Sequence, residues 1–193
     1  MRAALKLTFH TLTPKRWPDL EKLFGEKGAC GGCWCMCWRL ERADFIKGKG
    51  HGNKRAFRKL VAGNVQPGVL AYAGDEPIGW CAVAPRQDYP YLERSRVLAV
   101  VDDEKVWSIT CLFVARPYRR RGVSARLLKA AANLARKKGA KIVEGYPVEP
   151  NSSEMPAAFA WTGMVSAFER AGFEEVVRRS KTRPIMRRGR PKR

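Results

Sequence analysis

The sequence predicts a mixed α/β (α+β) domain, because short apolar runs alternate with segments of helical periodicity. Residues 68–73 and 77–84 are apolar runs on either side of a Gly-Asp-Glu turn, which is typical of a β-hairpin. Residues 106–115 form another apolar run, which leads through a basic, glycine-containing turn into a helix with one apolar face. These observations together predict a sheet of about six to seven strands flanked by helices.

The remaining elements follow from the same two periodicities. Pro14 suits the first turn of a helix, so a first helix is expected over 14–24, after a strand over 6–13. Gly139 stands where a helix beginning near residue 123 is expected to end. The other expected elements are a helix over 53–62, a strand over 141–146, a helix over 161–171 and two closing strands after 172–173.

The chain is expected to form one domain over residues 1–186, followed by a basic, disordered tail over 187–193. Its 193 residues are 45% hydrophobic, enough to bury a core, and no change in composition indicates a second domain. The tail contains Gly, Pro and five basic residues. No run of roughly 18 apolar residues and no apolar signal-peptide core is present, so we expect a cytoplasmic protein without membrane contact.

The turn between the strand over 106–115 and the following helix predicts an anion-binding site. The first turn of a helix has unpaired backbone N–H groups and a partial positive charge, so it favours phosphate. Gly122 allows close backbone approach, and Arg119, Arg120 and Arg121 are suited to charge-assisted hydrogen bonds with phosphates. The patterns of dinucleotide and P-loop nucleotide sites do not occur, which disfavours both kinds of site.

The spacing Arg119-x-x-Gly122-x-Ser124 resembles the R/Q-x-x-G-x-G/A signature with which the GNAT superfamily of acetyltransferases binds acetyl-coenzyme A (acetyl-CoA), although Ser124 replaces the usual Gly or Ala. The order of elements resembles that superfamily as well, and 168–173 (Phe-Glu-Arg-Ala-Gly-Phe) resembles its Y-x-x-x-G-F ending. The resemblance implies the GNAT fold, in which a mixed, mostly antiparallel sheet has a splayed V between its two central strands.

The resemblance also implies an acetyl-CoA-dependent N-acetyltransferase, in which a primary amine attacks the thioester directly. The cosubstrate would be acetyl-CoA, and no metal is expected. The strand before the turn would bind the coenzyme through backbone groups, and the turn would bind its phosphates. The residues expected to do so are Phe113, Val114, Ala115, Arg119, Arg120, Arg121, Gly122, Val123 and Ser124.

The catalytic groups that this chemistry needs are a base for the amine and an acid for the leaving thiolate. Glu144 is the first candidate for the base, ahead of Glu149 and Asp88. The resemblance places Phe168 where many GNAT enzymes have a Tyr, and Phe cannot donate a proton. Tyr146 is therefore the candidate acid; Tyr118 and protonation by bulk water are the alternatives.

Four cysteines are concentrated at positions 30, 33, 35 and 37. Structural zinc sites usually combine two C-x₂₋₄-C pairs across a longer loop, so a two-residue spacing disfavours a metal site, and the missing secretory signal disfavours disulfides. We expect the thiols to pack as small hydrophobic groups, while Trp34, Met36 and Trp38 line or cover the acceptor pocket. A metal site and an acyl-carrying cysteine remain as alternatives.

The formal net charge of +20 is concentrated in two segments without acidic residues. Residues 115–141 hold ten Lys and Arg around the expected coenzyme site, and residues 178–193 hold nine. The second cluster is either a solvated edge or a weak, nonspecific nucleic-acid contact. The alternative function is thus a nucleic-acid or ribosome-associated binding protein on a catalytically weak GNAT scaffold. The expected acceptor is a small-molecule or protein amine, and the expected state is a monomer or homodimer.

Overall fold

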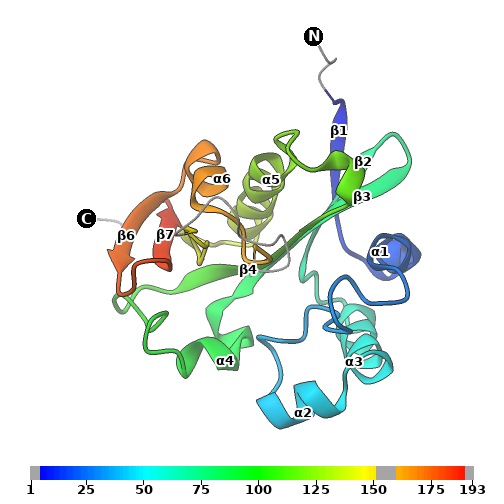
Figure 1. Ribbon diagram of the computed structural model, residues 1–193, viewed down its shortest axis with the longest axis horizontal. Coiled ribbons are helices and arrows are strands. Elements are labelled where there is room, and N and C mark those ends of the chain that lie inside the picture. Colours follow the sequence, from blue (N-terminus) through cyan, green and yellow to red (C-terminus); the bar gives the residue numbers. More distant parts are fainter. Residues whose placement is uncertain (1–4, 151–159, 190–193) are drawn as a thin grey trace.

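The computed structural model describes residues 5–150 and 160–189, and in these ranges it contains one seven-stranded sheet. The strand order is β1-β2-β3-β4-β5-β7-β6 (Figure 1). Only the central pair β4 and β5 is parallel; each other neighbouring pair is antiparallel. The predicted mixed, mostly antiparallel α/β fold is therefore confirmed.

The strands lie close to their predicted positions, and β2, β3 and β4 do so because each is a largely apolar run. The hairpin of β2 and β3 forms around the predicted turn at Gly74, which has a left-handed φ of 59°. The strands are β1 (Leu7–Thr11), β2 (Gly68–Ala73), β3 (Glu76–Pro85), β4 (Val106–Val114), β5 (Ile142–Gly145), β6 (Glu174–Arg178) and β7 (Pro184–Arg188).

The helices include two short ones that the sequence did not predict, α2 and α4, which are six and four residues long. They are too short to give a periodic signal. Within the described residues, no helix is both long and apolar enough to cross a membrane. The helices are α1 (Trp17–Phe24), α2 (Arg42–Lys47), α3 (His51–Ala62), α4 (Pro90–Glu93), α5 (Val123–Lys137) and α6 (Val165–Arg170).

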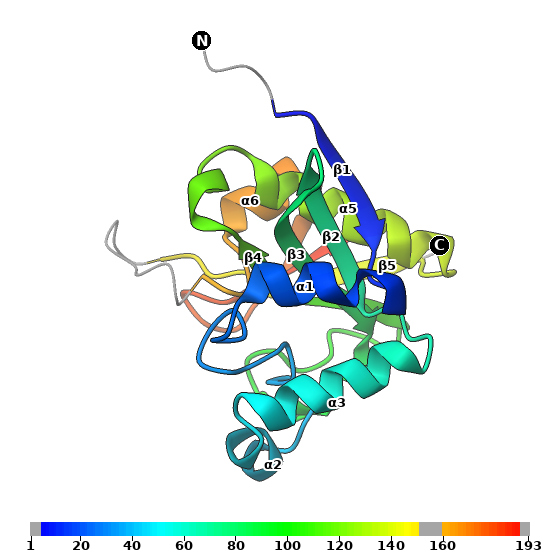
Figure 2. The same cartoon turned by 90° about the vertical axis from the view of Figure 1, so that its right-hand side faces the viewer.

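Helices cover both faces of the sheet, so the core has two main layers. Figure 2 shows α1 in front of β2 and β3, with α5 behind them. On the α5 side, Leu127, Leu128 and Ala131 are fully buried against the sheet. On the α1 side, Trp80 of β3 packs with Phe57 of α3, at 6.0 Å between ring centroids.

The central strands β4 and β5 diverge after a short paired stretch. They pair only from Val106 with Ile142 to Ile109 with Gly145, whereas β4 continues to Val114 along β3. The register between β3 and β4 shifts beside Thr110, which is the extra residue of a β-bulge. The bulge reverses the alternation of side chains, so Cys111 faces the α1 layer although Ile109 faces the α5 layer. The expected splayed V is thus present.

Phe168 of α6 is packed into the point where the strands diverge. The ring is fully buried, at 5.0 Å from the ring of Phe173. A Cβ atom at Gly145 would lie 2.1 Å from Cε1 of Phe168, and one at Gly163 would lie 2.8 Å from Cε2. The glycines at these two positions therefore make room for the ring.

The predicted tail boundary at residue 187 differs from the structure. Arg187 and Arg188 are the last two residues of β7, and Arg187 is only 8% exposed. Its guanidinium is bound by Asp102 and Glu144, which composition alone did not indicate. Residues 190–193, the rest of the predicted tail, lie outside the described residues.

Gly145→Ala is expected to lower the free energy of unfolding by about 1–3 kcal/mol, because the new methyl group overlaps the buried ring of Phe168. Urea unfolding of the wild type and the variant measures the loss. The control is Gly52→Ala in α3, where a Cβ meets nothing within 4 Å, so stability should stay equal or rise slightly. Equal stability of Gly145→Ala and the wild type would contradict the packing of this ring.

Candidate active site

A cleft of about 370 Å³ lies along the part of β4 that β5 leaves unpaired. One wall is β4, and another is the turn and first residues of α5, so the strand–turn–helix unit predicted from the sequence forms much of the cleft. The segment before α6 closes a third side. The lining residues are Ala29, Cys30, Leu112, Phe113, Val114, Arg119, Ser124, Ala160, Trp161, Gly163, Met164 and Ala167.

The backbone of β4 alternates between its partner β3 and the cleft. The N–H of Ala115 donates to the carbonyl of Ile78 at 2.9 Å, toward β3. The N–H of Leu112 donates to the carbonyl of Trp161 at 2.7 Å, on the opposite side. Strand alternation directs the N–H of Val114 to this second side. Of the three predicted strand residues, Val114 therefore presents its backbone to the cleft, Phe113 contributes its ring, and Ala115 is paired with β3.

The turn before α5 has the backbone conformation of an anion-binding loop. Arg120 and Gly122 both have left-handed φ angles, 58° and 74°, and consecutive peptide groups in such turns direct N–H groups into a concave surface. Gly122 is the N-cap of α5, and no side chain caps the helix. A Cβ at Gly122 would meet nothing within 4 Å, so glycine serves the backbone conformation and leaves open space above it. These features fit a coenzyme phosphate.

The predicted phosphate-binding residues have different surroundings in the structure. Arg119 and Ser124 line the cleft, and Nε of Arg119 donates to the carbonyl of Val114 at 2.9 Å. Arg120 and Arg121 are exposed on the turn. Val123 is 2% exposed and packs into the core, so only its backbone is available to a ligand.

A second, apolar pocket of about 140 Å³ adjoins the cleft. Five cysteines contribute to its walls, namely the four clustered ones and Cys111 of β4. The two cavities share Ala29, Cys30, Leu112, Phe113 and Trp161, so they lie side by side along β4. The other residues that line the pocket are Cys33, Cys35, Cys37, Trp38, Phe45 and Cys111.

Only Trp38 of the three predicted pocket residues lines this pocket. Trp34 and Met36 are buried in the α1 layer, and Trp34 lies 5.6 Å from Phe24 between ring centroids. Trp34 and Cys35 have left-handed φ angles of 43° and 56°, so the segment is a series of turns. In this arrangement the thiols face the pocket and the two large side chains face the core, the reverse of the prediction.

The thiols of the pocket differ in burial: Cys35 and Cys111 are buried, Cys33 and Cys37 are partly buried, and Cys30 is exposed. Burial raises the pKa of Cys33 to about 11, and it also raises the pKa values of Cys35 and Cys37. Sγ of Cys35 lies 3.4 Å from Sγ of Cys111 and accepts a hydrogen bond from Nε1 of Trp80 at 3.0 Å. Each of the six cysteines is a free thiol, and the described residues include no group of three side chains arranged to hold a metal ion.

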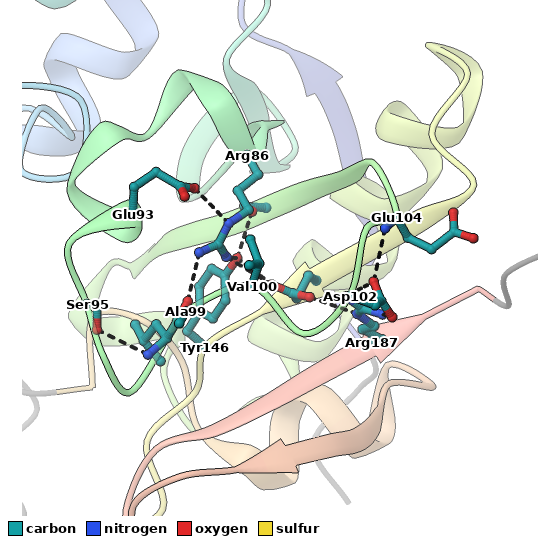
Figure 3. A network of polar contacts seen from close by, with 12 residues as sticks. Arg86, Glu93, Ser95, Ala99, Val100, Asp102, Glu104, Tyr146 and Arg187 are labelled. Carbon is teal, nitrogen blue, oxygen red and sulfur yellow. Dashed lines mark hydrogen bonds and ion pairs between the residues drawn. The ribbon is translucent and has the colours of Figure 1, made fainter.

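Glu144, the first candidate for the base, is part of a buried ion-pair network. The carboxylate is 1% exposed; one oxygen accepts from Nη1 of Arg86 at 3.2 Å, and the other accepts from Nε of Arg187 at 2.7 Å. Arg86 also pairs with Glu93, and Arg187 pairs with Asp102 (Figure 3). Both oxygens of Glu144 therefore accept hydrogen bonds within this network. Glu144 lines neither cavity.

Tyr146, the candidate acid, belongs to the same network. Its hydroxyl donates to Glu144 at 2.8 Å, accepts from Arg86 at 2.7 Å and contacts Ser108 at 2.8 Å. Burial raises the pKa of Tyr146 well above its usual range. The hydroxyl of Tyr118 donates to Glu76 at 2.6 Å instead of facing the cleft. Neither phenol lines a cavity.

The sequence did not identify Phe45, Cys111 or Trp161 as pocket residues. Cys111 faces the pocket because the bulge at Thr110 reverses the alternation of β4, and no residue pattern indicated the position of that bulge. The one sequence feature that pointed toward Trp161 was its position in the segment that precedes α6, seven residues before Phe168. Its ring lies 5.4 Å from that of Trp38.

Glu144→Gln is expected to lower the free energy of unfolding by about 3–5 kcal/mol, because it leaves two buried guanidinium groups without their shared countercharge. Urea unfolding at pH 7 measures the loss. The matched control is Glu149→Gln, which removes an exposed pair with Arg178 and should cost about 0–1 kcal/mol. A Glu144→Gln variant of unchanged stability would contradict the structural role.

The comparisons with known proteins agree with this geometry. Residues 34–156 match the Acetyltransferase (GNAT) family. Comparison with curated proteins gave no match. Similar solved structures include the PaiA N-acetyltransferase of Thermoplasma acidophilum in complex with coenzyme A, which is 14% identical, with 96% of this chain and 99% of that chain covered and a TM-score of 0.52.

Two further structures have the same fold at low identity. A GNAT family acetyltransferase of Listeria monocytogenes is 10% identical, with 95% of each chain covered and a TM-score of 0.57. One of Streptococcus agalactiae is 11% identical, with 98% of this chain and 99% of that chain covered and a TM-score of 0.57. The family match covers more than half of the sequence and includes β4, the turn before α5 and α5 itself. This chain belongs to the GNAT acetyltransferase family.

Proposed function

We propose that this protein is an acetyl-CoA-dependent N-acetyltransferase that transfers the acetyl group to a primary amine by direct attack on the thioester. The observation that carries the proposal is the edge of β4 beyond Ile109, which β5 does not pair with. There the N–H of Val114 faces the cleft beside the uncapped N-terminus of α5. The related Thermoplasma acidophilum enzyme, which was solved with coenzyme A, supports this choice of cosubstrate.

The strand and the turn would bind different parts of the coenzyme. The N-terminal N–H groups of α5 suit phosphate, and Arg119, Arg120 and Arg121 add charge-assisted donors. An extended chain with amide groups can pair with the free edge of β4 as an added strand would. Val114 offers the donor for such pairing.

The acetyl transfer needs few protein groups beyond these. Acetyl-CoA supplies the acetyl group as an activated thioester. A backbone N–H such as that of Val114 stabilises negative charge that develops on a carbonyl oxygen. Thiols have a pKa of about 8.5, so a thiolate can leave without a protein acid. This chemistry is compatible with Phe168 at the usual Tyr position and with Tyr146 being buried elsewhere.

Within residues 178–189, four arginines of the second basic cluster make structural contacts. Arg178 pairs with Glu149 and Glu175, and Arg179 donates to the carbonyls of Ala99 and Val100. The guanidinium of Arg183 donates to Thr162, and Arg187 belongs to the buried network. These arginines hold the closing strands to the rest of the protein. Of the two functions considered, the acetyltransferase is therefore the one that we propose.

Acetyl-CoA is expected to bind and raise the melting temperature, and Gly122→Val is expected to abolish that shift by disfavouring the left-handed turn. The control is Gly74→Val in the β2–β3 turn, which has a similar φ of 59° and equally open space. Both substitutions introduce the same kind of backbone strain, but only Gly122→Val changes the turn beside the cleft. Calorimetric titration with acetyl-CoA measures binding independently of stability.

Two results would contradict this assignment. One is a wild-type melting temperature that stays constant at saturating acetyl-CoA, with no heat of binding. The other is equal loss of binding in Gly74→Val and Gly122→Val, because the effect would then come from general strain.

A further inference from the structure

The apolar pocket is the part of the site available to an acceptor amine, and within the part of the chain that the structure describes no charged residue lines it. Its walls are aromatic rings and thiols, and the one charged residue of the adjoining cleft is Arg119. No carboxylate, imidazole or phenol of residues 5–150 and 160–189 lines either cavity. An ammonium group entering here would lose its water and gain aromatic faces but no counterion, whereas a neutral amino group has far less hydration to lose.

The thiols do not supply that counterion. Because burial raises the pKa values of Cys33, Cys35 and Cys37, these groups stay neutral at pH 7. Of the acidic residues next to the pocket segment, Glu41 pairs with Arg94, and neither Glu41 nor Asp44, which precedes Phe45, lines the pocket. The net charge of +20 further repels cations from the whole protein.

The size and walls of the pocket suit one ring. Its volume of about 140 Å³ is close to the roughly 150 Å³ of an apolar cavity that accommodates benzene. Trp38, Phe45, Phe113 and Trp161 provide aromatic surfaces, and thiols are polarizable groups that pack well against rings.

We propose, on the basis of the acetyltransferase function proposed above, that the acceptor is an aromatic amine that is uncharged at pH 7, as aniline is. The pocket binds the ring, and the amino group reaches the cleft at the shared wall of Phe113 and Trp161. Such an acceptor arrives with its nitrogen lone pair free, so the site needs no general base. This accounts for the confinement of Glu144 to a buried ion pair.

The step balances without a further reactant. The lone pair of the amine nitrogen forms a bond to the carbonyl carbon of the acetyl group, and the carbon–sulfur bond breaks. Its electron pair leaves with the sulfur of coenzyme A. One proton of the amino group passes through solvent to that sulfur or to buffer, which gives an acetanilide-type amide and free coenzyme A.

Aniline, benzylamine and spermidine distinguish the possibilities, because aniline is neutral at pH 7 whereas the other two are protonated. The full-length protein is incubated with acetyl-CoA and each amine between pH 6 and 9, and the acetylated product is quantified by chromatography against the uncatalysed rate. We expect aniline turnover at pH 7 to exceed benzylamine turnover at least tenfold. Benzylamine turnover should rise about tenfold per pH unit, with its neutral fraction, while aniline turnover stays nearly constant.

A carboxylate introduced into the pocket wall tests the same argument, because it should make a protonated amine a better acceptor than it is in the wild type. Cys30→Asp should raise the ratio of benzylamine to aniline turnover at pH 7 about tenfold or more, because Cys30 lines both cavities and the new side chain offers a counterion to an ammonium group that reaches the cleft. The control is Cys81→Ala, since Cys81 is buried in β3 and lines neither cavity. That variant should keep the wild-type ratio.

Faster turnover of benzylamine or spermidine than of aniline at pH 7 would overturn the inference about the acceptor and leave the acetyltransferase function intact. An unchanged ratio in a folded Cys30→Asp protein would overturn it as well. Failure to acetylate any of the three amines across the whole pH range, with acetyl-CoA bound, would count against both proposals.

Discussion

The early end of the pairing between β4 and β5 is the constraint on which the proposed active site depends. Beyond Ile109 and Gly145 the two strands separate, so β4 remains paired with β3 as far as Val114 but its opposite edge has no strand partner. The bulge at Thr110 lies immediately after the paired stretch and turns Cys111 and Phe113 toward the α1 layer. The end of β5 at Gly145 thus leaves the edge of β4 open, and the bulge turns Cys111 and Phe113 toward the pocket.

Buried charges stabilise the part of the sheet where β4 and β5 are paired, Val106 to Ile109 with Ile142 to Gly145. Ser108 pairs with Glu144 in register, and the carboxylate joins Arg86 of the β3–β4 connection to Arg187 of β7. Buried ions are costly unless each is paired and hydrogen-bonded, and here each oxygen of Glu144 has a cationic partner. The buried ion pairs lie at the closed end of the V, whereas Arg119 is the one charged residue that the described part of the chain contributes to the two cavities at the open end. This separation is the basis for an uncharged acceptor.

The sequence predicted the fold well where the signal was local. The hairpin around Gly74 and the unit of β4, turn and α5 depend on neighbouring residues, and both formed as expected. It did not predict which side chains of the cysteine segment face the pocket, because left-handed residues at 34 and 35 break any simple alternation. It also could not place Glu144, whose partners lie 58 and 43 residues away in the sequence.

Hydrogen exchange at the amide of Val114, with and without acetyl-CoA, tests the central claim most directly. The account predicts that acetyl-CoA slows exchange at Val114 and at the first amides of α5. Exchange at Ala115, whose N–H already donates to Ile78, should change little. Saturating acetyl-CoA that leaves exchange at Val114 unchanged while protecting another surface would contradict the claim that the free edge of β4 binds the coenzyme.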